Sequence, residues 1–157
     1  MNLRLIVKIL LVIIVILFIA IQFIPSSLNM GGQELATDIS KSVIMPSKVH
    51  SVLKNACYDC HSNNTYYPWY SKIQPARLIM DTHVKEGKEE LNFSEFGNYS
   101  TRSQINKLKG LANSIKDNIM PLSSYKLMHK SANLSDEEKN LIINWALQTS
   151  DSLTTKK

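Results

Sequence analysis

The chain is poor in cysteine and shows few of the patterns that mark sheets, zinc sites or nucleic-acid binding. It has two cysteines among 157 residues, and one histidine, His61, directly follows the second cysteine. The other histidines, His50, His83 and His129, are isolated. A structural zinc site needs about four ligands, so this set does not supply one. The formal net charge is +5 without a basic stripe, which gives no reason to expect a nucleic-acid partner. No alternating run of strand length occurs, so we expect an all-α fold.

The N-terminus, residues 1–24, is a hydrophobic run interrupted only by Lys8 and Gln22 after its first few residues. About 20 residues at ~1.5 Å rise each match a hydrocarbon thickness of roughly 30 Å. Arg4 and Lys8 lie at the start of the run, which predicts a cytoplasmic N-terminus and export of the rest. A cleaved signal peptide is the alternative, but the run exceeds its usual ~7–15 apolar residues and no small-x-small site follows. We expect an uncleaved single-pass anchor in the bacterial cytoplasmic membrane.

The rest of the chain is expected to form one small domain in the periplasm. Residues 25–46 contain Pro, Ser, Gly and Asn without a sustained apolar period, which predicts a linker. Residues 47–150 are long enough for one modest core. Residues 151–157 are expected to be a flexible tail.

Four segments of this domain have apolar residues at three- and four-residue steps, which is the spacing of one helix face. These segments are 47–60 with Ser47 as N-cap, Pro75 to near Gly87, Ser100 or Thr101 to Ile119, and Ser135 onward. In the second segment Leu78 and Ile79 are expected to face inward. In the last, Ser135 and Glu138 form a capping box before an apolar stripe that includes Trp145, which predicts ordinary core packing for that ring. We expect about four helices with long loops between them.

The two cysteines lie in the string NACYDCHSNNTYYPWY, which begins at Asn55. A thioredoxin-type thiol pair belongs on a βαβ scaffold with the first thiol at a helix N-terminus, whereas this pair ends a predicted helix. Cys-x-x-Cys-His is the attachment signature of c-type haem. On one helical turn, Cys57 and Cys60 can form thioethers to the two vinyl groups, and His61 then lies beneath the ring and can bind the iron.

Three blocks of sequence carry a wider resemblance. CYDCHSNNTYYPWYSKIQPARLIMDTHVKEGKEELNFSEF, MPLSSYKLMH and LSDEEKNLIINWA, in this order, resemble the small haem-binding domain family of Bacteroidota envelope proteins, which are typically short membrane-anchored chains. The resemblance covers residues 46–147. It implies a small cytochrome c-like helical fold with one haem c bound at Cys57, Cys60 and His61. The family pattern has a tryptophan near Phe96 and a second proline at the position of Leu122, and neither departure removes a ligand.

A six-coordinate iron needs a second axial ligand, for which the sequence offers four candidates. We expect Met120, because it follows an apolar helix and precedes Pro121, which would present the thioether on a stiff loop. His83 is the main alternative, and Met128 and His129 are the others. The common role of a methionine is to fill gaps in a core, and that of a lone histidine is to bond to a loop carbonyl.

An aromatic cluster follows the cysteines, and it contains Tyr66, Tyr67, Trp69 and Tyr70. Such rings could line a porphyrin edge and bond to a propionate, and we expect Tyr67 and Trp69 to contact the haem. A minor aromatic core beneath a loop is the alternative.

Together these observations predict a membrane-anchored monohaem c-type protein that transfers single electrons to redox partner proteins in the periplasm. A haem-based sensor or small-ligand binder with an open distal position is the alternative function. We do not expect an enzyme, because no His-Arg arrangement suggests a distal acid-base pair.

Overall fold

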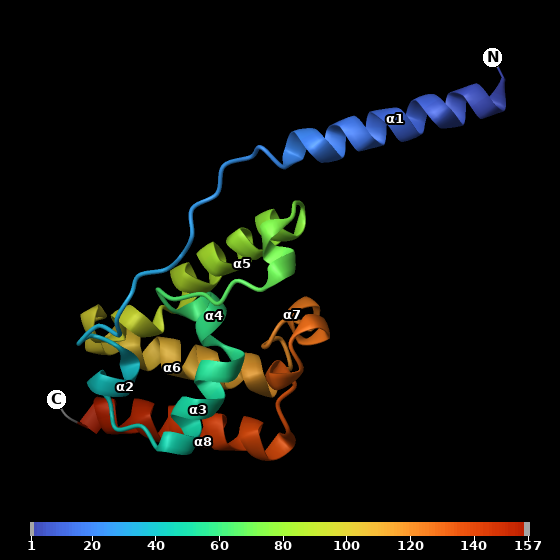
Figure 1. Ribbon diagram of the computed structural model, residues 1–157. Coiled ribbons are helices and arrows are strands. Elements are labelled where there is room, and N and C mark those ends of the chain that lie inside the picture. Colours follow the sequence, from blue (N-terminus) through green and yellow to red (C-terminus); the bar gives the residue numbers. More distant parts are fainter. Residues whose placement is uncertain (1, 156–157) are drawn as a thin grey trace. The chain divides into compact units, whose positions relative to one another are not determined.

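The computed structural model describes residues 2–155, and within this range the chain is helical with no strand (Figure 1). A single isolated bridge pairs Met30 with Asn64. The α-helices are α1 Leu3–Ile21, α2 Ile39–Ser42, α3 Ser47–Ala56, α4 Tyr58–His61, α5 Ala76–Glu90, α6 Thr101–Lys116, α7 Ser123–Met128 and α8 Asp136–Thr155, and the 3-10 helices are η1 Trp69–Lys72, η2 Phe93–Asn98 and η3 Lys130–Ala132. The predicted all-α fold is confirmed. The four predicted domain helices correspond to α3, α5, α6 and α8.

The chain divides into two compact units. Unit 1 comprises the N-terminal segment through Leu28 together with Tyr66–His83. Unit 2 comprises Asn29–Thr65 and the chain from Val84 onward. The division falls inside α5, so one continuous helix contributes to both units. In unit 1, helix α1 is long and apolar enough to cross a membrane.

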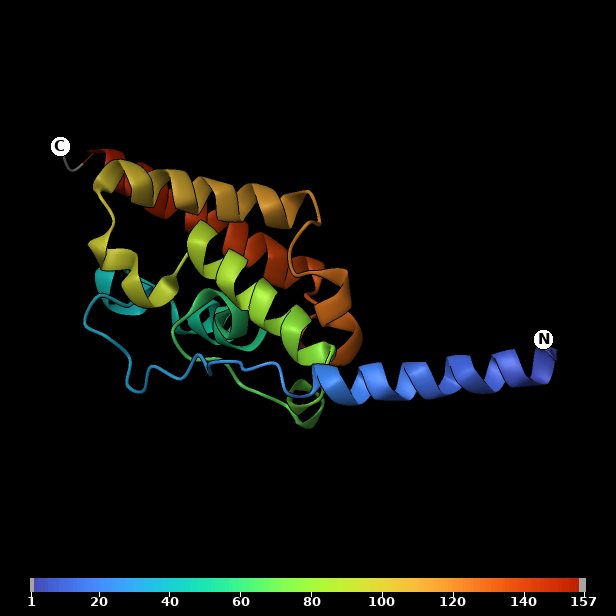
Figure 2. The ribbon, with the colours of Figure 1, turned by 90° about the horizontal axis from the view of Figure 1, so that it is seen from above.

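In unit 2, α6 and α8 form an antiparallel pair (Figures 1 and 2). The reason is visible in the sequence, because Leu108, Ala112 and Ile115 recur at steps of four and three on α6 and all three are buried. The stripe of α8 contributes Ile142 and Trp145. Packing the two stripes together removes both from water.

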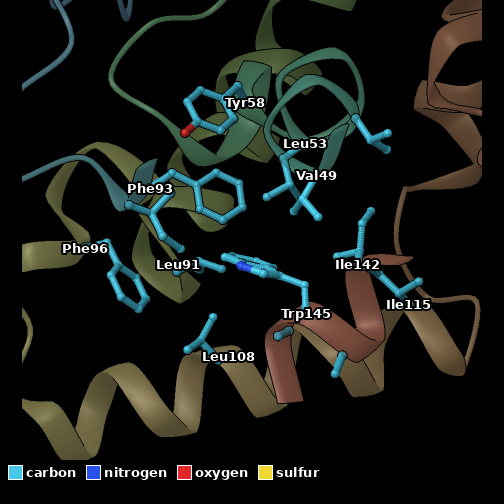
Figure 3. Close-up of a cluster of buried hydrophobic side chains, with 14 residues drawn as sticks. Val49, Leu53, Tyr58, Leu91, Phe93, Phe96, Leu108, Ile115, Ile142 and Trp145 are labelled. Atoms are coloured by element: carbon cyan, nitrogen blue, oxygen red, sulfur yellow. The ribbon is translucent and has the colours of Figure 1, made fainter. Parts of the chain in front are cut away.

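Trp145 lies in the middle of the core, as predicted. Figure 3 shows its ring between Leu108 and the side chains of Leu53 and Phe93. Its indole N–H donates to the carbonyl of Ile44 at 3.1 Å, so the ring's only polar atom is satisfied although the residue is buried. Trp145 therefore ties α8 to the chain that leads into α3.

Capping hydrogen bonds mark where the long helices begin and end. The Ser100 hydroxyl accepts from the Ser103 N–H at the start of α6, and the predicted capping box of Ser135 and Glu138 opens α8. At the other end of α6, Asn118 has φ +57°, and the next N–H bonds back to the carbonyl of Ser114 in a Schellman arrangement. This turn ends α6 at Lys116.

Three expectations about the boundaries differ from the structure. The predicted linker 25–46 includes α2, and Ile39 within it is fully buried against the core because Asp38 caps a short helix there. Residues 151–155 of the predicted tail continue α8, while residues 156–157 lie outside the described range. Ile119, expected on the third helix, lies beyond its end and is exposed.

Helix α5 also differs from its expected orientation. Leu78 and Ile79 were predicted to face inward, but both are about half exposed. The buried position of this first turn belongs to Arg77, whose guanidinium pairs with Asp81 at 2.8 Å. Because an i,i+4 ion pair occupies the inward side of the turn, the two apolar side chains point outward.

We expect Phe93→Ala to lower the free energy of unfolding by about 3–5 kcal/mol, because Phe93 is fully buried and its loss leaves a cavity in the core of unit 2. Urea denaturation of the full chain in detergent, followed by circular dichroism, measures this. Ile44→Ala is the control, because its side chain is 92% exposed and the change should cost less than about 0.5 kcal/mol. Equal effects of the two substitutions would contradict the assigned core.

Candidate functional site

The two cysteines and His61 lie on one helical turn, residues 57–61, which we call the attachment turn after the haem-attachment signature in its sequence. The N–H groups of Cys60 and His61 both donate to the carbonyl of Cys57, at 3.2 and 3.0 Å. The predicted helix 47–60 is not continuous, because Cys57 has φ −130° and ends α3. In an unbroken helix the Tyr58 side chain would point about 140° away from that of Leu53, five residues earlier. Because the helix breaks at Cys57, the side chains of Tyr58 and Leu53 are both buried in the core.

A backbone carbonyl, that of Leu91, orients the imidazole of His61. Its Nδ1 lies 2.9 Å from the Leu91 oxygen, and the ring is part-buried. A carbonyl only accepts, so Nδ1 carries the hydrogen and Nε2 keeps its lone pair. Burial lowers the pKa of His61 below its usual value, against smaller opposite effects from the carbonyls of Leu91 and Gly87. The ring is therefore a neutral electron-pair donor near pH 7.

The Leu91 carbonyl is available because α5 ends one residue earlier, at Glu90. The Leu91 N–H still donates to Gly87 at 2.9 Å and closes the last helical turn, while its own carbonyl lies past the helix. The end of α5 thus supplies the acceptor that orients His61.

The two residues between the cysteines hold the turn from both sides. Tyr58 is buried and stacks on Phe93 with ring centroids 5.0 Å apart, and its hydroxyl donates to the buried carboxylate of Asp38 at 3.0 Å. Asp59 accepts from the hydroxyl of Tyr125 on α7 at 2.6 Å. Core packing on one side and a charge-assisted hydrogen bond on the other therefore fix the turn.

Gly87 allows α5 to pass close to this turn. A Cβ at this position would lie 2.7 Å from the Cys60 carbonyl oxygen and 3.2 Å from its Cβ. Contacts of that kind with backbone are not tolerated without a shift. Any larger residue at position 87 would push the attachment turn away from the helix that orients His61.

The thiols of Cys57 and Cys60 are not joined in a disulfide. Burial raises the pKa of Cys57 to about 12, and the charge of Cys60 adds to the shift. Burial also raises the pKa of Cys60 to about 11, with a contribution from Asp59. Cysteines of thiol-disulfide enzymes have lowered pKa values, so these protonated thiols do not fit that chemistry.

The structure brings some predicted ligands into unit 2 and leaves others in unit 1. Met120, half-buried, lies on the connection between α6 and α7, and its N–H donates to the Ser114 carbonyl at 3.1 Å. Met128 ends α7 and is exposed. The ring of His129 stacks on Tyr125 at 3.9 Å.

Three further predicted residues, Tyr67, Trp69 and His83, belong to unit 1. The Tyr67 ring faces the Arg77 guanidinium at 4.6 Å, and Trp69 is 73% exposed. Their predicted contacts with the cofactor stay predictions.

Some residues that build the site had no recognised role in the sequence. Gly87 was visible only as a helix end, and the pairing of Asp59 with Tyr125 joins positions 66 residues apart. Phe93 lies in a stretch that is too short and too polar for its sequence to predict a helix. A backbone carbonyl such as that of Leu91 has no side-chain signal at all.

Comparison with known proteins gives one match. A family model described as a haem-binding domain matches residues 16–148, which is most of the chain. No curated protein matches the chain. No solved structure matches it either.

Replacing Gly87 with alanine should destabilise the protein relative to the matched change Gly110→Ala. Both glycines lie within helices, but nothing lies within 4 Å of a Cβ at Gly110. Gly110→Ala should therefore raise the free energy of unfolding by about 0.5–1 kcal/mol. The free energy of unfolding of Gly87→Ala should be about 1–3 kcal/mol lower than that of Gly110→Ala, because the new Cβ clashes with Cys60. Chemical denaturation of both variants is the measurement, and equal stabilisation would show that the close approach does not exist.

Proposed function

The chain belongs to the haem-binding domain family and is a haem-binding protein; from this premise we propose that it carries one covalently attached haem c and transfers single electrons while anchored in the bacterial cytoplasmic membrane. The thiols of Cys57 and Cys60 would hold the haem through thioethers, and the side chains of His61 and Met120 would bind its iron. The bound haem would supply an iron that changes by one electron between its ferric and ferrous states.

The arrangement of His61 is the observation that carries this proposal. The ring is partly withdrawn from water, neutral, and oriented by the Nδ1 bond to Leu91, which leaves Nε2 as the donor atom. A hydrogen bond from the second ring nitrogen to a carbonyl is how metal-binding histidines are usually oriented. Nε2 needs no hydrogen-bond donor from the chain, because it would bind the iron through its lone pair.

The cysteine pair fits covalent attachment. Each thiol can add its S–H across a vinyl group, so that sulfur bonds to one carbon and the hydrogen goes to the other, without an oxidant. The two thiols lie on the turn that the Cys57 carbonyl closes, directly before the iron ligand. Their raised pKa values disfavour a thiol-disulfide function.

Met120 is proposed as the distal ligand because of the chain that surrounds it. It lies five residues before Tyr125, whose hydroxyl bonds to Asp59 between the cysteines. Five residues reach at most about 17 Å, so this hydrogen bond keeps the Met120 segment within range of the attachment turn. The backbone bond to Ser114 restrains it further. A thioether ligand raises the reduction potential relative to a second histidine, which suits electron transfer.

The proposed anchor is α1. Its 19 residues span about 28 Å as a helix, close to the hydrocarbon thickness, and its side chains are exposed along its length. Arg4 at its start favours a cytoplasmic N-terminus, which would put the haem domain in the periplasm. Covalent attachment of haem c in bacteria takes place on that side of the membrane.

Haem should remain with the polypeptide when the full chain, made in a bacterium competent for cytochrome c maturation, is extracted with acidic acetone. The Cys57→Ala/Cys60→Ala variant should lose this retention, since both thioethers are absent. Ser51→Ala, on the exposed face of α3, is the matched control and should retain haem as the parent does. A mass spectrum of the parent that shows only the bare polypeptide would disprove covalent attachment.

Met120→Ala should open the ferrous protein to carbon monoxide, whereas the parent should be unreactive because His61 and Met120 would both bind the iron. Absorption spectra of reduced samples before and after carbon monoxide measure this. Met128→Ala is the matched control, because it removes an exposed thioether from the end of α7. If His83→Ala changes the spectrum and Met120→Ala does not, the assigned ligand is wrong. A parent protein that binds carbon monoxide would favour the sensor function instead.

A further inference from the structure

Unit 1 exposes a group of large apolar and aromatic side chains close together in the chain. We call it the unit 1 patch, and its members, between 43% and 73% exposed, are Tyr66, Trp69, Ile73, Leu78 and Ile79. Three of them were expected in the haem contact or the core rather than on a surface. Exposed apolar groups of this kind mark contact sites.

Hydrogen bonds tie the patch to the end of α1. The Gln22 side chain, just past α1, donates to the Gln74 carbonyl at 3.3 Å and accepts from the Gln74 N–H at 3.0 Å. The Gln74 side chain in turn accepts from the Leu78 N–H at 3.0 Å, at the start of α5. Arg77 adds a bond to the Ser27 carbonyl at 3.1 Å. Segments 52 positions apart therefore meet where the apolar helix ends.

The composition of the patch fits the boundary between lipid headgroups and acyl chains. Trp and Tyr are enriched at this depth because they combine an apolar ring with a polar atom. Lys72, exposed among them, can approach lipid phosphates. The single carboxylate among residues 66–83 is Asp81, and Arg77 already neutralises it. No unpaired negative charge from this segment opposes contact with an anionic surface.

We infer that the unit 1 patch inserts into the headgroup boundary of the bilayer that α1 spans, as a second attachment of the chain to the membrane. This inference rests on the proposed membrane anchoring. The occupant of the patch is phospholipid. In the two competing outcomes the patch contacts the haem or a protein partner instead. Either of these would leave residues 66–79 out of contact with lipid.

The test uses the haem-loaded full chain in vesicles of phosphatidylcholine and phosphatidylglycerol that contain a phospholipid with a photoreactive diazirine on its acyl chain. After illumination, mass spectrometry should find lipid adducts on residues 66–79 as well as on α1. Ile44, which is 92% exposed but lies in unit 2, is the control for labelling by exposure alone. Adducts as frequent at Ile44 as in the patch would overturn the inference.

The remaining outcomes separate this inference from the proposed function. A chain that does not float with the vesicles would disprove the anchor itself. Flotation with adducts on α1 but none on residues 66–79 would overturn only the second attachment. Ile73→Ser, which removes a patch side chain that has no predicted contact with the haem, should reduce adducts in the patch about threefold while the haem absorption spectrum stays unchanged. A changed spectrum of Ile73→Ser, together with no adducts on residues 66–79 in the parent, would mean that the patch faces the haem and would overturn the inference.

Discussion

The hydrogen bond between Nδ1 of His61 and the Leu91 carbonyl is the interaction on which the site depends. It selects the tautomer, aims the ring, and leaves Nε2 as the one electron-pair donor. It exists because α5 stops at Glu90, so that the next carbonyl is not used within the helix. The length of one helix thus decides the chemistry of a side chain 30 residues earlier in the chain.

The rest of the site keeps the attachment turn where this bond can form. Tyr58 anchors the turn in the core through Phe93 and Asp38, and Asp59 anchors it to α7 through Tyr125. Gly87 allows the helix and the turn to approach each other closely. All of these contacts join groups of the polypeptide itself, and they would hold the thiols and the imidazole in place for a cofactor. Preorganisation of this kind lowers the entropic cost of binding.

Attachment to a bilayer would change the kinetics of electron exchange more than the chemistry of the site. A tethered carrier meets membrane-bound partners at a raised effective concentration, set by the reach of its anchor. The hydrogen bonds between Gln22 and Gln74 join the end of α1 to residues after the attachment turn. An anchor fixed at two points of the chain restricts the accessible positions of unit 1 more than a flexible linker would.

The sequence predicts the main helices from the spacing of apolar residues, and it contains the Cys57, Cys60 and His61 motif directly. Apolar steps of three and four identify α6 and α8, and the Ser135 capping box marks a start that the structure confirms. Boundaries were less accurate, because a helix end such as that at Asn118 depends on one residue adopting a left-handed conformation. The burial of Ile39 was missed because one apolar residue in a polar stretch has no period.

What the sequence determined by itself is the all-α class, the apolar N-terminal helix, and the spacing of Cys57, Cys60 and His61, since each is a property of neighbouring residues. Tertiary structure alone decided the break at Cys57, the Leu91 acceptor, the Gly87 contact and the outward turn of Leu78 and Ile79. The physical reason is that these depend on which surfaces distant segments bury together. A backbone carbonyl or an absent Cβ becomes meaningful only when another part of the chain packs against it.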